Sequence, residues 1–524
     1  MAKQQKLFAG AGILALAGLI AKVLSAVYRV PFQNIVGNQG FYVFQQVYPI
    51  YGIGMVMALS GWPLFISKMV AEQPTQAEKR LVARRLFWLL AGISIAIFAL
   101  IYFGASVIAM GMQDMRLVPE IKAVAWMFLL MPCLATSRGY TQGQFDMVPT
   151  ALSQVIEQVV RVAIILGVAW FGMQHAWDVY RIGTWATFAA TIAGVATTIY
   201  LFKSLRDFNP FQRGKAVMSG DLRYGQLWQR LWREGGLLAL LAALLVFLQL
   251  IDSFTVKGAL VQGGLSNTVA ERTKGVYDRG QPLVQLGMVV ATGLGTSLLP
   301  TLHTHWQNRA ETALKQAFQM TVRMSLVFSA LTTLGLIAIM PVVNMFLFSS
   351  REGDVALMWY VTIIIPATLI TVLTSVLQSM NRTHGLVWFV GISLGAKYLG
   401  NLFLIPTWDI AGAGVATLVA LLPLLAFVIW RIPGQLWPGM LTWQWWGRLG
   451  LVLGTMVITA VVVRWGGDAL FGQTRGASIL TCCFAGLSGA TVAIYGIIHL
   501  HIFNQTELLA LPKGEYLAQL SKGN

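Results

Sequence analysis

The sequence contains little charge for its length. Only 11% of the 524 residues are Asp, Glu, Lys or Arg, whereas a soluble domain carries about 25%. Hydrophobic residues make up 56% of the chain, and the mean hydropathy is +0.67. Too few charged side chains are present to cover several soluble domains. We therefore predict an integral membrane protein whose function lies within the bilayer.

The chain also lacks the usual signatures of a redox, metal or nucleotide site. Its three cysteines, Cys133, Cys482 and Cys483, all lie in apolar segments, which implies neither a disulfide framework nor a metal site. No GxxxxGK[ST] phosphate-binding loop is present. No cluster of carboxylates suits metal-dependent glycosyl or phosphoryl transfer. We therefore expect a protein that is not an enzyme and that holds no metal and no cofactor.

Long apolar segments are abundant, and about fourteen of them can each cross a membrane as a helix of about 20 residues. The predicted fold is an all-α polytopic membrane protein with about fourteen transmembrane helices. The expected spans are roughly 7–29, 42–67, 86–110, 122–142, 150–172, 181–203, 234–257, 274–300, 316–340, 355–378, 384–404, 411–430, 446–465 and 477–500.

Basic residues gather in alternate connections between these spans, and the connection 204–233 is the richest in them. The positive-inside rule then places both termini in the cytoplasm of a multi-pass cell-membrane protein. The net charge of +17 faces anionic membrane lipid, which attracts each basic residue by about 1 kcal/mol. The expected partner of this charge is therefore anionic lipid, and no nucleic acid is needed to explain it.

An internal repeat divides the chain. The segment that starts at Pro49, PIYGIGMV, resembles the segment that starts at Pro282, PLVQLGMV. The same offset carries expected spans three to six close to the starts of spans nine to twelve. Six spans per half is an even number, so the two six-helix lobes are parallel repeats. The predicted division is a lobe 1–203, a basic linker 204–233, a lobe 234–432, two added helices within 433–500 and a tail 501–524.

Few charges remain inside the spans, where each costs about 3 kcal/mol or more unless it pairs, reaches the interface or faces a cavity. Lys22 and Arg29 are seven residues apart and share one face of the first helix. They are candidates for binding an anionic group. In the alternative, Arg29 reaches the outer interface and Lys22 has a structural partner.

Two further cations, Lys274 and Arg279, open the eighth span beside Asp278. They are candidates for supplying positive charge from the other half of the duplicated bundle. The alternative is a cluster at the interface that Asp278 neutralises.

Four charged residues are candidates for coupling or gating. Asp252 follows a long apolar stretch, and it needs a proton, a cation or a basic partner; the alternative is a salt bridge with Lys257. Lys397 stands alone, deep in its span. Glu157 and Arg161 have the spacing of a helical ion pair.

Arg138 and Arg323 lie within a turn or two of the predicted cytoplasmic ends of their spans. Long basic side chains at such positions extend to the interface. We therefore expect both residues to do so and to take no part in a binding site.

Several motifs resemble one known family. They are KVLSAVYRVPF from Lys22, GNQG from Gly37, YPIY from Tyr48, SGWP from Ser60, ISKMVAE from Ile66, and YDRGQPLVQLG from Tyr277. Together with the span pattern, which covers nearly the whole chain, they are similar to the polysaccharide-biosynthesis branch of the MOP exporter superfamily. The likeness is greatest to the group of stage V sporulation protein B and the MurJ-like lipid II flippases.

The resemblance implies two six-helix lobes, with spans thirteen and fourteen forming a lipid groove. It also implies movement of undecaprenyl-pyrophosphate-linked sugars, lipid II above all, from the inner to the outer leaflet. Such flippases bind pyrophosphate with arginines on helices one, two and eight. Here helix one offers Lys22 and Arg29, and helix eight offers Lys274 and Arg279. Helix two offers no basic residue before Lys68, so the source of a third cation stays open.

The resulting hypothesis is a monomeric flippase of lipid-linked oligosaccharides that works by alternating access. Na⁺ or H⁺ at Asp252, or the membrane potential, would reset it. One alternative with the same fold is an ion-coupled multidrug exporter, although a basic cavity and two extra helices argue against it. Another is an intramembrane glycosyltransferase or polymerase, which would need an acid/base pair or metal site that the short external connections do not offer.

Overall fold

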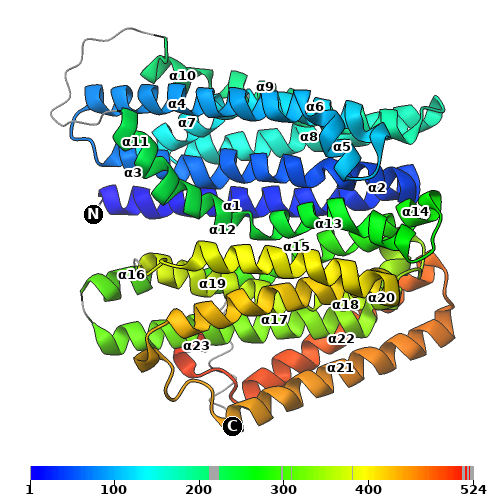
Figure 1. The fold of residues 1–524 in the computed structure, drawn as a ribbon. Helices are drawn as coiled ribbons and strands as arrows, with labels where there is room; N and C mark the ends of the chain where they lie inside the picture. The colour runs from blue at the N-terminus through cyan, green and yellow to red at the C-terminus, as the bar shows by residue number, and fades with distance from the viewer. Residues whose placement is uncertain are drawn as a thin grey trace. The chain divides into compact units, whose positions relative to one another are not determined.

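The computed structural model describes residues 2–211, 224–296, 299–308, 310–380, 382–509, 514–515 and 519. These residues form helices and connections and no strand, as Figure 1 shows. Eleven helical segments among them are long and apolar enough to cross a membrane. Two of the eleven, Gly12–Ala71 and Leu386–Arg431, contain a break and each accounts for two predicted spans. The predicted all-helical fold with roughly fourteen spans is confirmed.

The helices form two compact units, Met1–Asp278 and Arg279–Asn524. The first unit contains these helices in chain order: α1 (Ala2–Val27), α2 (Arg29–Val56), η1 (Met57–Gly61), α3 (Trp62–Ala71), α4 (Gln76–Phe103), α5 (Ala105–Gly111), η2 (Met115–Leu117), α6 (Val118–Phe128), α7 (Met131–Gly143), α8 (Val148–Gln174), α9 (Val179–Tyr200), α10 (Phe202–Phe208), α11 (Tyr224–Arg230), η3 (Leu231–Gly236), α12 (Leu237–Ala242), α13 (Leu244–Gln262) and α14 (Asn267–Asp278).

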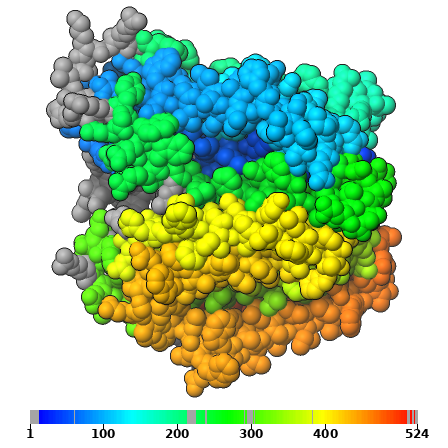
Figure 2. Space-filling view, viewed as in Figure 1, coloured from blue at the N-terminus to red at the C-terminus, as the bar shows by residue number. Residues whose placement is uncertain are grey.

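This unit extends beyond the predicted lobe 1–203, because α13 and α14 pack against α2. The division into compact units follows packing alone, so the repeat-based boundaries at 203, 234 and 432 stay a prediction. In the space-filling view, the dark-blue N-terminal residues are visible in a hollow between light-blue and green segments of the same unit (Figure 2).

Two glycines position the first helices of this unit. Gly37 has φ 71°, a left-handed value that glycine adopts without steric cost, and it turns the chain between the first and second spans. The first helical run therefore continues to residue 36, instead of ending near residue 29 as expected. At Gly139 on α7, an added Cβ would lie 2.5 Å from Ile66 Cβ. Such small residues let membrane helices approach closely, and here they bring α7 onto α3.

The second unit contains α15 (Gly280–Thr296), α16 (Leu299–Gln307), α17 (Glu311–Phe348), α18 (Asp354–Val361), α19 (Ile364–Ser379), α20 (Leu386–Arg431), η4 (Gly434–Leu436), α21 (Trp443–Phe471), α22 (Arg475–His499) and α23 (Gln505–Leu509).

Two features of the second unit match the expected pattern of spans. The long helix α20 is interrupted at Asp409, which has φ 55° and ψ −149°, and this break separates the expected spans 384–404 and 411–430. The two added helices α21 and α22 pack against each other and against α17. Their shared core includes Met324, Leu449 and Ile497.

Candidate functional site

Five residues of the first unit form a buried group of arginines and tyrosines, Tyr28, Arg29, Tyr48, Tyr51 and Arg161, called here the guanidinium–tyrosine cluster. Arg29 is 2% exposed, and its guanidinium carbon lies 4.3 Å from the centroid of the Tyr48 ring. Arg161 is also 2% exposed and lies 4.6 Å from the Tyr51 ring and 5.6 Å from the Tyr28 ring. Cation–π contacts of this kind stabilise a desolvated cation by about 2 kcal/mol or more.

The local fold explains why these side chains are buried. Because the first helical run continues to the turn at Gly37, Arg29 lies about two helical turns before that turn, and its side chain does not reach the surface of the unit. Phe32 lies before the turn at Gly37 and Phe44 after it, and their rings pack with centroids 4.9 Å apart. Tyr48 and Tyr51 follow on α2, three residues apart, and share a face of that helix.

The positive charges of the cluster have no carboxylate beside them. Within the described part of the chain, no Asp or Glu oxygen lies within 4 Å of either guanidinium group. Arg161 donates to Gln158 Oε1, and its Nη2 lies 3.5 Å from Ser25 Oγ. The Nε atoms of Arg29 and Arg161 and the Tyr51 hydroxyl are buried and make no hydrogen bond to a described residue. Buried polar atoms normally have partners, so this donor-rich site suits an anionic ligand.

The predicted ion pair between Glu157 and Arg161 is wrong. Glu157 Oε2 instead accepts a hydrogen bond from Arg138 Nη2 at 2.6 Å, and both side chains are buried. Arg138 also donates to Ser153 Oγ at 2.9 Å and to the Ala58 carbonyl at 3.2 Å. Its predicted extension to the interface is therefore also wrong. Because Glu157 pairs with Arg138, it forms no salt bridge with Arg161.

A second group lies on α13 and α14 and consists of Asp252, Lys274, Tyr277 and Asp278, called here the aspartate group. Lys274 Nζ pairs with Asp278 Oδ2 at 2.8 Å, so the alternative in which Asp278 neutralises Lys274 is observed. Tyr277 donates to Asp252 Oδ2 at 3.1 Å. Asp278 also interacts electrostatically with Asp252 and with Arg29. The aspartate group thus lies within electrostatic range of Arg29.

A third group, called here the clasp, consists of Asp114, Arg116, Tyr180, Lys257 and Glu271. It joins α13 and α14 to η2 and α9. Lys257 Nζ lies 2.9 Å from Glu271 Oε1 and 3.3 Å from Asp114 Oδ2, so the alternative salt bridge between Lys257 and Asp252 is wrong. Arg116 pairs with both of these acids, and Tyr180 donates to Asp114 at 2.7 Å.

The protonation of Asp114 follows from these contacts. Burial alone would raise the pKa of Asp114, but the hydrogen bonds from Tyr180 and Arg116, together with the charge of Lys257, hold it below its usual value of 3.8. The clasp therefore contains a carboxylate that stays ionised at neutral pH.

Three further predicted site residues are Lys22, Arg279 and Lys397. Lys22 is on α1, seven residues before Arg29, and its side chain is exposed. Arg279 belongs to the second unit, where it donates to Asn344 Oδ1 at 3.1 Å and lies over the Phe348 ring. Lys397 is buried on α20 before the break at Asp409, and it donates to two groups after that break, the Ala413 carbonyl at 3.0 Å and Thr417 Oγ1 at 2.6 Å. Their predicted roles stay predictions.

Comparisons with known proteins show the family of the chain. The family model described as "Polysaccharide biosynthesis protein" matches residues 7–306. The chain belongs to this family. It is 33% identical over 530 residues to the "Uncharacterized membrane protein YabM" of Bacillus subtilis (strain 168), covering 99% of this chain and 97% of the relative. It is 26% identical to the "Lipid II flippase MurJ" of the same organism, over 79% of this chain and 80% of that protein.

The fold agrees with this assignment. A solved structure titled "Lipid II flippase MurJ, inward closed conformation" matches with a TM-score of 0.67 and 11% identity, over 93% of this chain and 99% of that one. At this identity the match concerns the fold alone. The predicted membership of the polysaccharide-biosynthesis branch of the MOP superfamily is confirmed.

The second predicted span, 42–67, contains no basic residue that could supply a third cation. Lys68, which follows it on α3, pairs with Glu234 at 2.6 Å, and its side chain is 57% exposed. The buried cation beside Arg29 is instead Arg161 on α8. Sequence reasoning gave Arg161 a different role, because its spacing from Glu157 favoured a helical pair. The tyrosine-rich segment around Tyr48 was a signal that an aromatic cluster could hold a cation.

Sequence reasoning also missed Glu120 on α6. This side chain is 1% exposed, and its Oε1 accepts a hydrogen bond from Thr187 at 2.7 Å. Its Oε2 makes no hydrogen bond to a described residue, and no described basic side chain lies within 4 Å. Glu120 stands two residues before Lys122 at the start of an expected span, and an acidic residue at that position is the signal that could have identified it.

Proposed function

We propose that the protein is a flippase that moves an undecaprenyl-pyrophosphate-linked sugar, with lipid II as the expected substrate, between the leaflets of the cell membrane. The single observation that carries the proposal is the guanidinium–tyrosine cluster. It holds two buried arginines with no carboxylate within 4 Å among the described residues, and buried donor atoms that lack partners. The 26% identity to a lipid II flippase over four-fifths of both chains supports it.

The chemistry of the cluster fits a pyrophosphate. A guanidinium group is always charged, and its planar fork matches two phosphate oxygens at once. Arg29 and Arg161 would each take one phosphate, and the hydroxyls of Tyr28 and Tyr51 would donate to the remaining oxygens. The stacked tyrosine rings hold both guanidinium groups in place before the ligand arrives. Affinity then is not reduced by the ordering of long flexible side chains.

The aspartate group offers a way to couple substrate binding to an ion. A phosphate bound at Arg29 would add negative charge within electrostatic range of the buried carboxylates of Asp278 and Asp252. A proton or Na⁺ at Asp252 or Asp278 would offset the negative charge that is then left buried. In this proposal, the cation favours return of the empty transporter in an alternating-access cycle.

Complementation of a strain depleted of its lipid II flippase tests the proposal. We expect wild-type protein to restore growth, and Arg29→Ala and Arg161→Ala to abolish the rescue. Arg29→Lys should rescue weakly, because an ammonium group lacks the bidentate fork. The matched control is Arg181→Ala, since Arg181 also stacks on an aromatic ring, at 4.0 Å from Trp177, but is exposed.

Membrane levels of every variant are compared by immunoblot, so that loss of protein is not read as loss of transport. Full rescue by both alanine variants at wild-type levels contradicts the proposed role of the cluster. Failure of the wild-type protein to rescue, together with normal membrane levels, contradicts lipid II as the substrate.

A further inference from the structure

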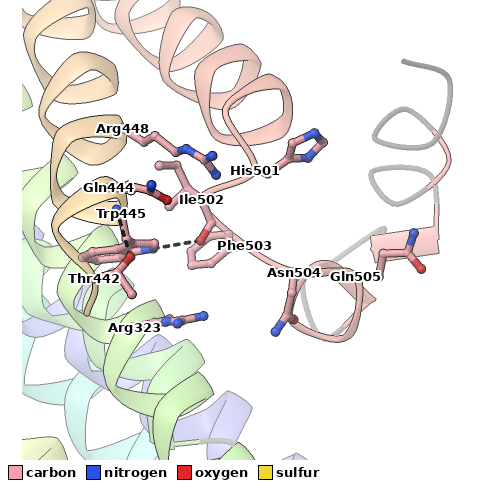
Figure 3. A pocket seen from close by; sticks show the side chains of 10 residues that line it. All are labelled: Arg323, Thr442, Gln444, Trp445, Arg448, His501, Ile502, Phe503, Asn504 and Gln505. Carbon is pink, nitrogen blue, oxygen red and sulfur yellow. Dashed lines mark hydrogen bonds between the residues drawn. The ribbon is translucent and has the colours of Figure 1, made fainter. Parts of the chain in front are cut away.

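The second unit contains a basic pocket at the start of α21. Its volume is about 470 Å³, within the usual range of about 300–1,000 Å³ for small-ligand sites. Its walls come from α17, from the first two turns of α21 and from the turn between α22 and α23 (Figure 3). The lining residues are Arg323, Thr442, Gln444, Trp445, Arg448, His501, Ile502, Phe503, Asn504 and Gln505.

The lining is positively charged. Two arginines line the pocket, and neither Asp nor Glu is among its described lining residues. Arg323 is occupied, because it donates to the Met440 carbonyl at 2.6 Å and pairs with Glu507 at 3.4 Å. Arg448 makes no hydrogen bond or ion pair to a described residue, and Figure 3 shows its guanidinium group pointing toward Ile502 and His501. Arg448 is thus the cation available to a ligand.

Hydrogen bonds within the protein hold the walls of the pocket in place without a ligand. The Trp445 indole donates to the Ile502 carbonyl at 3.0 Å, which ties α21 to the turn after α22. Thr442 caps α21 by accepting from the Trp445 backbone N–H at 3.2 Å. The Asn504 backbone N–H donates to Glu507 Oε2 at 2.8 Å. Because residues of the first two turns of the 29-residue helix α21 line the pocket, the positive end of its dipole lies beside the pocket.

The surroundings place the pocket at the level of lipid head groups. Trp443 and Trp446, in the first turn of α21, are 91% and 43% exposed, and exposed tryptophans mark the membrane–water interface. Further along the same helix, the exposed side chains are apolar, among them Leu451, Ile458 and Val462, each about 60% exposed or more. The pocket thus opens where the lipid-facing surface of α21 begins.

We propose that this pocket binds the phosphate of an anionic glycerophospholipid, with Arg448 as the main charged contact and His501, Gln444 and Asn504 as hydrogen-bond donors. The pocket is large enough for the glycerol head group beside the phosphate. The acyl chains then extend along the apolar face of α21. A lipid bound here joins α21 to the turn after α22 and stabilises the packing of the two added helices on α17.

The test measures lipid binding to the purified full-length protein in neutral detergent by native mass spectrometry, with the apparent melting temperature as a second readout. The ligands are phosphatidylglycerol, phosphatidylcholine and inorganic phosphate. We expect phosphatidylglycerol to bind and to raise the melting temperature, and the other two to do so much more weakly. Arg448→Gln should weaken phosphatidylglycerol binding about tenfold, the effect of losing one charge-assisted contact.

Lys315→Gln is the matched control, because Lys315 is a cation on α17 near the same end of the unit but is not among the lining residues. It should bind phosphatidylglycerol like the wild type. Because Arg448 is exposed, its variant should fold normally, which circular dichroism without lipid checks. Equal binding by Arg448→Gln and the wild type overturns the proposal, as does equal binding of phosphatidylcholine. Stabilisation by inorganic phosphate equal to that by phosphatidylglycerol overturns the assignment to lipid.

Discussion

The buried ion pair between Arg138 and Glu157 gives a quantitative prediction about the guanidinium–tyrosine cluster. Arg138 is fully buried, and it donates to Glu157, to Ser153 and to the Ala58 carbonyl of the π-helical turn η1. Such turns leave backbone groups without their usual helical partners. Arg138 therefore links α7 and α8 to η1 and also holds Glu157 away from Arg161.

Replacement of Arg138 by Met removes all three contacts and leaves a buried carboxylate without its partner. Breaking a buried pair in this way costs about 3–5 kcal/mol of stability. Glu157 is one helical turn from Arg161, so we expect it to pair with Arg161 in the variant. Arg138→Met should therefore lower both the stability and the affinity for an anionic substrate.

The double variant Arg138→Met/Glu157→Met separates these effects. It removes the buried carboxylate, so it should regain most of the stability that Arg138→Met loses, since apolar replacements of buried pairs are often close to neutral. It should also regain substrate affinity, because Arg161 is again without a carboxylate. Thermal unfolding in detergent and rescue of growth measure the two properties. A double variant less stable than both single variants would refute the reasoning.

Three further predictions follow from single contacts. Glu120→Gln should unfold near the wild-type temperature, because the amide oxygen still accepts the hydrogen bond from Thr187; a large loss of stability would contradict the account in which this hydrogen bond is the main polar contact of the side chain. Lys257→Met should speed hydrogen exchange in 244–278, because it leaves the buried carboxylate of Glu271 without one of its partners; unchanged exchange would contradict the clasp. In the wild type, the clasp should weaken only below about pH 4, where the depressed pKa of Asp114 is crossed, and weakening near neutral pH would contradict this assignment.

Hydropathy and motifs were sufficient for the fold class and the family. Apolar length alone located most spans, and the break at Asp409 falls between two of them. The end of the first helix was missed because residues 30–36 have mixed polarity, and only the left-handed conformation of Gly37 shows where the chain turns. As a result, Arg29 is more deeply buried than its place in the sequence indicated.

Partner choice among charged residues was the part that sequence could not provide. Spacing along one helix favoured Glu157 for Arg161 and Asp252 for Lys257. In both cases residues from other helices compete more closely, Arg138 for Glu157 and Glu271 for Lys257. Proximity along a helix is known from the sequence, but the rotation of one helix against another depends on packing. For that reason the sequence indicated that Arg161 is a charge within a span, but it did not show that Arg161 lies beside Arg29.

Direct binding of a lipid-linked pyrophosphate to the purified protein tests the central claim. Equilibrium affinity for lipid II is measured by native mass spectrometry for the wild type, Arg29→Gln, Arg161→Gln and the control Arg181→Gln. We expect each cluster variant to bind about tenfold more weakly or worse, and the control to bind like the wild type. Equal affinity of all four proteins would contradict the claim that the guanidinium–tyrosine cluster holds the pyrophosphate.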